Sequence, residues 1–248
     1  MNRFHRYLMV VLVVVLPSGC DRDGDGFVGR DDCDDSNPDI GDGTYVGDLD
    51  SDWSSLCSIG CERLITGSLV LNTASKSDIA SLTCLVEVHR DVIVESNDDI
   101  NNFSGLDSLK HIGGDLVIDR SDFLTSLKGL EKLAKIDGNI EVSYNDNLRT
   151  LQSIGDVTSI GFLTIYGNYS LSDLSGLEGL VEIRGSLDLL GNLSLSDVWS
   201  LHNVTRVGGY FVLSGNPSLC ESDAYKLLET IGEENIGVSY GIIDLKDC

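Results

Sequence analysis

The segment Ile183–Asn192, IRGSLDLLGN, contains the pattern that decides the fold. After its glycine, apolar and other residues alternate as Leu187-x-Leu189, which is the period of a strand with one buried face. An asparagine follows the strand. The chain carries this pattern seven times at a spacing of 23 or 24 residues, opening at Ile65, Val88, Ile112, Ile136, Ile160, Ile183 and Val207.

A repeat of this length predicts a solenoid. A single coil cannot bury its own apolar side, whereas stacked coils share a continuous core. Where the chain bends away from each strand, we expect a buried asparagine to satisfy unpaired backbone groups. A helix with Ser222 as its N-cap is expected to cover the last coil with Leu227, Leu228 and Ile231. The expected asparagines are Asn97, Asn145, Asn168, Asn192 and Asn216, and Ser121 interrupts their column.

The pattern I-x-G-x-L-x-I-x-x-N-x-x-L-x-x-L-x-G-L resembles the receptor L-domain family, the leucine-rich β-helix of insulin- and EGF-receptor ectodomains. It is most similar to the bacterial secreted versions, over residues 57–248 and including the closing SGNPSLCESDAYKLLETIG. The resemblance implies a mostly β fold, a right-handed β-helix or leucine-rich solenoid with a short C-terminal capping helix. An ordinary leucine-rich horseshoe is the alternative. We expect a signal peptide at 1–19, an acidic leader at 20–52 and about seven coils over 53–248.

The first nineteen residues have the features of an export signal. Basic residues precede the apolar run Leu8–Leu16, whose nine residues are too few to cross a bilayer. The ending LPSGC resembles the lipobox of bacterial lipoproteins and implies acylation of Cys20, although Pro17 stands where leucine is usual. Ordinary signal-peptidase cleavage is the alternative. We therefore expect a membrane-anchored lipoprotein of the bacterial cell envelope, at the outer membrane or cell surface rather than the inner membrane.

The leader contains the spacing D-x-D-x-D-G-x5-D, which is that of an EF-hand loop. Alternate carboxylates around a glycine turn supply the several oxygen ligands that calcium requires. The following DCDDSNPDI resembles the DCDD-x-NP motif of bacterial metal-binding repeats. A solvated acidic linker is the alternative. The expected calcium ligands are Asp21, Asp23, Asp25, Phe27 through its carbonyl, Asp32, Asp34 and Asp35.

The chain has seven cysteines, and assigning Cys20 to lipid leaves an even number for disulfides. Cys61 and Cys84 both lie four residues before the apolar residue that opens their repeat. Neighbouring coils lie ~4.8 Å apart, which is within the range for a disulfide. We therefore predict the pairs Cys61–Cys84, Cys220–Cys248 and Cys33–Cys57, with another partner for Cys33 as the alternative.

A formal charge of −23 argues against a nucleic-acid partner. No histidine lies near a serine or cysteine motif such as G-x-S-x-G, and the chain has no HExxH motif. A calcium-dependent polysaccharide-acting enzyme on a β-helix would need acids and a base converging on neighbouring coils. The outward acids Asp91, Glu95, Asp115, Asp119, Glu141 and Asp188 form no such column, and Arg90 and Arg120 only flank strands. We expect no enzymatic activity.

Outward positions of neighbouring coils carry a candidate binding patch of Phe162, Tyr166, Leu190 and Tyr210. Exposed aromatic side chains on a rigid sheet suit docking of a protein or glycan. Cross-strand stacking that only stabilises the sheet is the alternative. The expected function is recognition or adhesion without catalysis, with a passive structural envelope component and the polysaccharide-acting enzyme as alternatives.

Overall fold

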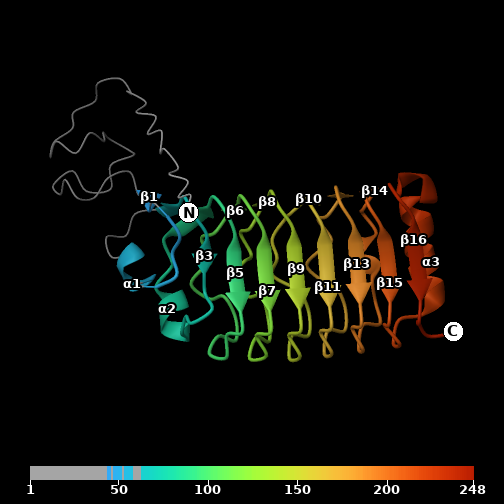
Figure 1. The fold of residues 1–248 in the computed structure, drawn as a ribbon, viewed down its shortest axis with the longest axis horizontal. Coiled ribbons are helices and arrows are strands. Elements are labelled where there is room, and N and C mark those ends of the chain that lie inside the picture. Colours follow the sequence, from blue (N-terminus) through green and yellow to red (C-terminus); the bar gives the residue numbers. More distant parts are fainter. Residues whose placement is uncertain (1–43, 46, 52, 58–62) are drawn as a thin grey trace, which may run out of the picture. The chain divides into compact units, whose positions relative to one another are not determined.

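The computed structural model describes residues 44–45, 47–51, 53–57 and 63–248, which belong to one compact unit. This unit is a β-solenoid of parallel strands (Figure 1), so the predicted mostly β solenoid fold is confirmed. The predicted lipidation and calcium residues, together with Cys33 and Cys61, lie outside the described residues.

The long strands form one eight-stranded parallel sheet. Equivalent repeat positions pair across it, as Leu163 does with Ile140 on one side and Leu187 on the other. The strands are β3 (Leu69–Val70), β5 (Val92–Glu95), β7 (Leu116–Asp119), β9 (Ile140–Ser143), β11 (Leu163–Tyr166), β13 (Leu187–Leu190), β15 (Phe211–Ser214) and β16 (Tyr240–Ile243).

Short strands form two further parallel sheets, one of five strands and one of three. After the first, each short strand ends on the apolar residue that opens a repeat, so every repeat contributes one short and one long strand. The first sheet contains β1 (Thr44–Tyr45), β2 (Arg63–Ile65), β4 (Leu85–Val88), β6 (His111–Ile112) and β8 (Lys135–Ile136). The second contains β10 (Ser159–Ile160), β12 (Glu182–Ile183) and β14 (Arg206–Val207).

Short helices cover the ends of the stack and one of its loops. They are α1 (Trp53–Leu56), α2 (Lys76–Ala80), η2 (Trp199–Leu201), α3 (Glu221–Ile231) and η3 (Glu233–Asn235). As predicted, α3 buries Leu227, Leu228 and Ile231. The predicted N-cap at Ser222 is wrong: α3 starts at Glu221, whose N–H donates to the Lys246 carbonyl. The C-terminal tail therefore supplies an acceptor for the first N–H of the helix.

A ladder of side-chain amides, the asparagine ladder, connects the coils where the long strands end. The backbone N–H of Asn145 donates to Oδ1 of Asn168 (2.9 Å), and that of Asn168 donates to Oδ1 of Asn192 (3.0 Å). In return, Nδ2 of Asn168 donates to the Val142 carbonyl of the preceding coil (2.8 Å). The ladder side chains are buried, as predicted for Asn97, Asn145, Asn168, Asn192 and Asn216, and Ser121 Oγ accepts the N–H of Asn97.

The residue before each ladder position has a positive φ, which turns the chain away from the strand. Glycine adopts this conformation without the steric cost that a Cβ brings. The later coils use glycine and the earlier coils do not. The column consists of Ser96, Arg120, Tyr144, Gly167, Gly191 and Gly215, with φ between 49° and 67°.

A second ladder, the entry ladder, lies where the chain enters the long strands. Asp91 Oδ1 accepts the N–H of Asp115 (2.8 Å), Asp115 Oδ1 accepts that of Asn139 (2.7 Å), and Asn139 Oδ1 accepts that of Phe162 (2.7 Å). These oxygens lie directly over the glycine of the next coil. A Cβ at Gly138 would be 2.1 Å from Asp115 Oδ1, which explains why glycine recurs before this position.

Two disulfides join Cys57 to Cys84 and Cys220 to Cys248, with Cα–Cα distances of 5.4 and 5.7 Å. The predicted pair Cys220–Cys248 is confirmed. The predicted pairs Cys61–Cys84 and Cys33–Cys57 are wrong, because Cys84 and Cys57 bind each other.

The cause of the wrong pairing is a break in the repeat register. Between β2 and β4 the register shifts by one residue after Arg63, so equal spacing before Ile65 and Val88 does not mean equal position. In addition, α1 buries Trp53 and Leu56 in the core and places Cys57 beside Cys84.

The asparagine ladder makes a direct prediction for stability. Asn168→Ala removes partners from the buried Asn145 N–H and the Val142 carbonyl, so we expect a loss of about 2–4 kcal/mol in the free energy of unfolding. Asn147→Ala is the control, since its exposed amide also bonds a carbonyl of the preceding coil, that of Asp122. Urea unfolding followed by circular dichroism measures both. Equal losses in the two variants would contradict a special role for the ladder.

Candidate functional site on the outward face of the long sheet

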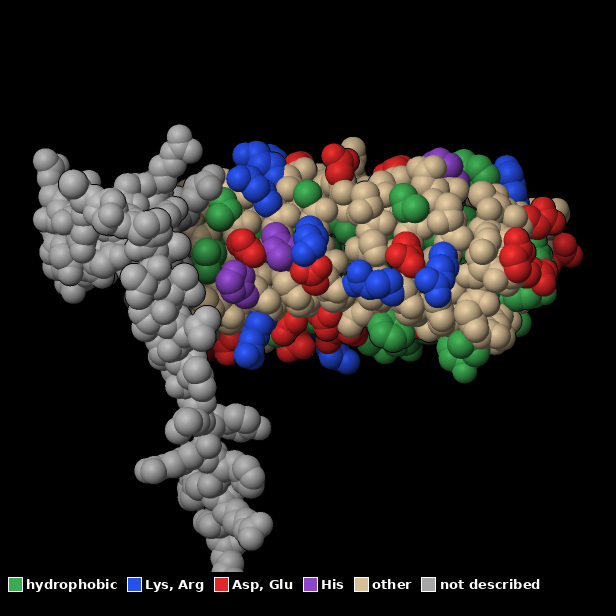
Figure 2. All heavy atoms as spheres, turned by 90° about the horizontal axis from the view of Figure 1, so that it is seen from above, with side chains coloured by type: hydrophobic (Ala, Val, Ile, Leu, Met, Phe, Trp, Pro, Cys, Tyr) green, Lys and Arg blue, Asp and Glu red, His purple; other side chains and the backbone are tan. Residues whose placement is uncertain are grey.

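The outward face of the long sheet changes character along the solenoid. Over the earlier coils, several outward positions carry acids, including Glu95, Asp119 and Glu141, whereas the later coils carry exposed aromatic residues beside Thr164 and Asp188. Figure 2 shows this change along the lower edge of the solenoid, with charged side chains at lower left and hydrophobic side chains at lower right. The face therefore has an acidic part and an apolar part.

The predicted aromatic patch lies on the apolar part. Phe162, Tyr166 and Tyr210 are 49%, 40% and 51% exposed, and Leu190 is half-buried. Leu190 is the register neighbour of Tyr166 on the adjacent strand. The structure thus places all four predicted residues on one face, with Phe162 and Tyr210 at the entry of the strands and Tyr166 and Leu190 at their ends.

Each end of the patch packs against a neighbouring coil. The Phe162 ring lies over Gly185, where a Cβ would be 2.7 Å from ring atoms. The Tyr166 ring packs edge-to-face on Tyr144, with ring centroids 4.8 Å apart. Cross-strand stacking, the alternative reading of the patch, therefore occurs at Tyr166. The rings keep a defined orientation while a large fraction of their surface stays in solvent.

A polar row of Thr164 and Asp188 separates the two ends of the patch on β11 and β13. Asp188 lies between Thr164 of β11 and Val212 of β15 in the strand register. Partial burial raises the pKa of the Asp188 carboxyl above its ordinary value. The patch therefore combines ring faces with a carboxyl group and a hydroxyl group, which can exchange hydrogen bonds with a polar ligand.

Two of the outward acids predicted from the sequence have a structural role. Asp91 and Asp115 accept backbone N–H groups in the entry ladder. Asp119 lies beside Arg120, and partial burial together with the Glu95 charge raises the pKa of its carboxyl despite that arginine.

The short-strand sheet carries a charge network that the sequence reading missed. His111 lies between two carboxylates, with Nδ1 2.8 Å from Glu87 Oε1 and Nε2 2.8 Å from Asp137 Oδ2. Both contacts are hydrogen bonds only when both ring nitrogens carry a proton. The Lys135 ammonium adds a contact to Asp137 Oδ2 at 2.8 Å. The strand register pairs His111 with Glu87 on one side and with Lys135 on the other. Each of these residues stands directly before the residue that opens a repeat, so the sequence could have shown that they are neighbours.

The network joins three coils by charge and has no nucleophile within its contacts. Hydrogen bonds from Lys135 and His111 lower the pKa of the Asp137 carboxyl. Among the residues that the structure describes, no group of three His, Cys, Asp or Glu side chains could hold a metal ion. In the same part of the chain, no helix is long and apolar enough to cross a membrane.

The chain was compared with known protein families, curated proteins and solved structures. No protein-family model, curated protein or solved structure matches the chain. The resemblance to receptor L-domains therefore remains a prediction from the repeat pattern.

The charge network predicts a pH dependence of stability. Because the folded-state pKa of Asp137 is lowered, its contribution is present above the unfolded value of about 3.8 and is lost as pH falls through the folded pKa. We expect Asp137→Asn to cost up to about 1 kcal/mol at pH 7, since the pair is solvent-exposed, and the difference from wild type to shrink below about pH 4.

Thermal unfolding of both proteins between pH 7 and 2.5 measures this difference. Glu229→Gln on the exposed side of α3 is the control, and its difference from wild type should stay near zero at pH 7. A difference for Asp137→Asn that grows as the pH falls would contradict a stabilising role of the ionised Asp137 carboxylate.

Proposed function

We propose that this protein is a lipid-anchored component of the bacterial cell envelope that recognises a glycan through the aromatic patch, without catalysis. The observation that carries the proposal is the exposure of Phe162, Tyr166 and Tyr210 on one face of a rigid parallel sheet. Large exposed aromatic side chains grouped on one surface are characteristic of binding sites.

A glycan fits this patch better than a protein partner does. The two ends of the patch are four residues apart along a strand, roughly 13 Å, with Thr164 and Asp188 between them. Successive sugar rings of an extended chain present apolar faces to rings and hydroxyl groups to such polar side chains. A stable protein interface would need about 800 Å² on each partner with a continuous apolar centre, which the polar row interrupts.

Charge restricts the class of glycan. The net charge of −23 and the acidic part of the sheet next to the patch repel anionic polymers. We therefore propose a neutral or amino-sugar-containing glycan. The use of Asp91 and Asp115 by the entry ladder supports binding over polysaccharide cleavage, because those carboxylates already accept backbone N–H groups.

The leader completes the proposal. Acylation of Cys20 would anchor the chain in the membrane, and calcium bound by Asp21, Asp23, Asp25 and Asp32 would brace the segment that follows. These roles rest on the sequence motifs. The disulfides at Cys57–Cys84 and Cys220–Cys248 leave Cys33 and Cys61 as the remaining candidates for a third bond.

Replacing the three rings by the residues that neighbouring coils use at the same positions tests the patch. Phe162→Asn follows Asn139, Tyr166→Ser follows Ser143, and Tyr210→Ser follows Ser186, so the solenoid should remain folded. We expect the triple variant to lose at least about tenfold in affinity for neutral envelope polysaccharides, because three aromatic contacts of ~0.5–1.5 kcal/mol each together exceed the ~1.4 kcal/mol of a tenfold change.

Binding to immobilised neutral and acidic polysaccharides from bacterial envelopes, followed by biolayer interferometry, measures this affinity. Phe123→Ser is the matched control, since Phe123 is 59% exposed but lies outside the patch. Unchanged binding by the triple variant would refute the patch as the binding surface. Binding to envelope proteins and to no polysaccharide would refute a glycan as the ligand of the patch.

Calcium binding by the leader is tested separately. Isothermal titration of residues 21–248 should show calcium binding that Asp23→Ala/Asp25→Ala removes, because two of the expected ligands are lost. Asp146→Ala/Asp156→Ala in the solenoid is a control with the same loss of charge. The absence of binding heat in the wild type would reduce the leader to an acidic linker.

A further inference from the structure

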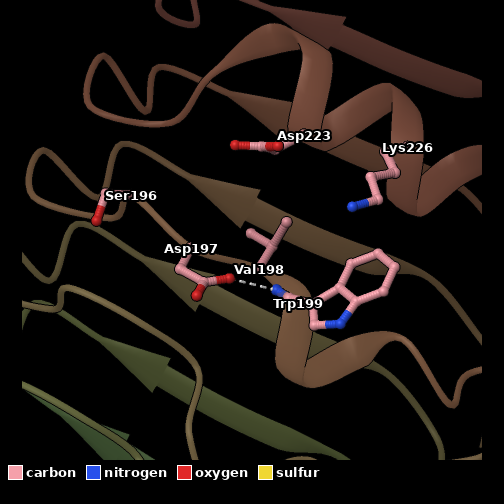
Figure 3. Close-up of a pocket in the computed structure, with 6 residues that line it drawn as sticks. All are labelled: Ser196, Asp197, Val198, Trp199, Asp223 and Lys226. Atoms are coloured by element: carbon pink, nitrogen blue, oxygen red, sulfur yellow. Dashed lines mark hydrogen bonds between the residues drawn. The ribbon is translucent and has the colours of Figure 1, made fainter.

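An open cavity of about 480 Å³ lies between the loop before η2 and the first turns of α3, away from the strands of the aromatic patch. Figure 3 shows Asp223 and Lys226 reaching over it from the helix, with Asp197 and Trp199 on the opposite wall. The lining residues are Ser196, Asp197, Val198, Trp199, Asp223 and Lys226.

Trp199 forms an oriented aromatic wall of this cavity. The residue is 41% exposed, although its backbone is held by two contacts. Asp197 Oδ1 accepts the Trp199 N–H at 2.7 Å, and His202 Nδ1 lies 2.8 Å from the Trp199 carbonyl. The His202 ring stacks on the indole at 5.5 Å with an interplanar angle of 12°. The wall therefore has a defined orientation, and part of its surface stays in solvent.

An ammonium group already occupies this wall. Lys226 Nζ lies 4.4 Å from the centroid of the Trp199 ring, which is a cation–π contact. In the described part of the chain, Lys226 forms no ion pair with Asp197 or Asp223, although all three line the same cavity. The cavity is thus lined by two carboxylates and an indole ring, all of which attract a cation, and the Lys226 ammonium contacts the ring.

We propose that this cavity binds an organic ammonium group and that Lys226 occupies the aromatic wall until such a ligand displaces it. Ammonium recognition by an indole face is strengthened by nearby carboxylates, because ring and carboxylates attract the same charge. The four-carbon stem of Lys226 lets its ammonium move into solvent at little cost. The net charge of −23 raises the local concentration of cations around the protein.

The same chemistry occurs in a choline headgroup and in an amino sugar. Both carry an ammonium group small enough for the cavity, and they differ in what surrounds it. The experiment therefore uses choline chloride and glucosamine as probes, with N-acetylglucosamine as the neutral counterpart and sodium chloride at equal ionic strength as the salt control.

The chain has two tryptophans, so the indole N–H signal of Trp199 is assigned in a ¹⁵N NMR spectrum by its loss in Trp199→Phe. We expect choline or glucosamine to shift this signal in a saturable way. Lys226→Met removes the competing charge and keeps the length of the side chain. It should therefore tighten the affinity for the ammonium probe by about threefold or more.

The carboxylates should act in the opposite direction. Asp197→Asn keeps an acceptor for the Trp199 N–H, and Asp223→Asn changes one exposed helix residue, so both variants should fold. Each should weaken binding by about twofold or more. An equal shift with N-acetylglucosamine, no saturable shift in either wild type or Lys226→Met, or weaker binding by Lys226→Met would each overturn the proposal. The aromatic patch plays no part in it, so this result is independent of the proposed function.

Discussion

The hydrogen bond from the backbone of one coil to the buried asparagine of the next is the interaction on which the stack depends. At the end of each long strand the chain must turn, and a turn leaves backbone groups that no strand can pair. The asparagine side chain pairs both an N–H group and a carbonyl group of the turn. Oδ1 of Asn192 accepts the Asn168 N–H, and Nδ2 of Asn192 donates to the Ile165 carbonyl. Because each amide serves two coils, the positions of neighbouring turns are coupled.

With both ends of the long strands fixed by ladders, the outward face between them is free to vary. The inward positions are apolar and buried in every coil, whereas outward positions range from Glu141 to Tyr166 without changing the strand register. The entry ladder shows how this freedom is used: Asp115 and Asn139 accept backbone N–H groups, and Phe162 at the same position presents a ring. A docking surface can therefore arise without loss of the scaffold.

The repeat spacing predicted the solenoid, its strands and the buried asparagines, because strand period and coil length are properties of local sequence. It did not predict contacts that depend on neighbouring coils. Asp91 and Asp115 were read as outward acids, yet their oxygens meet the next coil's backbone. The one-residue register shift between β2 and β4 made the Cys61–Cys84 pairing wrong. The charge network at His111 and the cavity at Trp199 likewise join segments more than twenty residues apart.

Hydrogen exchange at the backbone amides of Asn145, Asn168 and Asn192 measures whether the asparagine ladder holds the coils together. Each of these N–H groups donates to the side chain of the next coil and lies in the core of the turn. We expect them to exchange as slowly as the amides of the long strands, since they open only when coils separate. Exchange as fast as that of exposed turn residues such as Asn147 would show that the ladder does not hold the coils together.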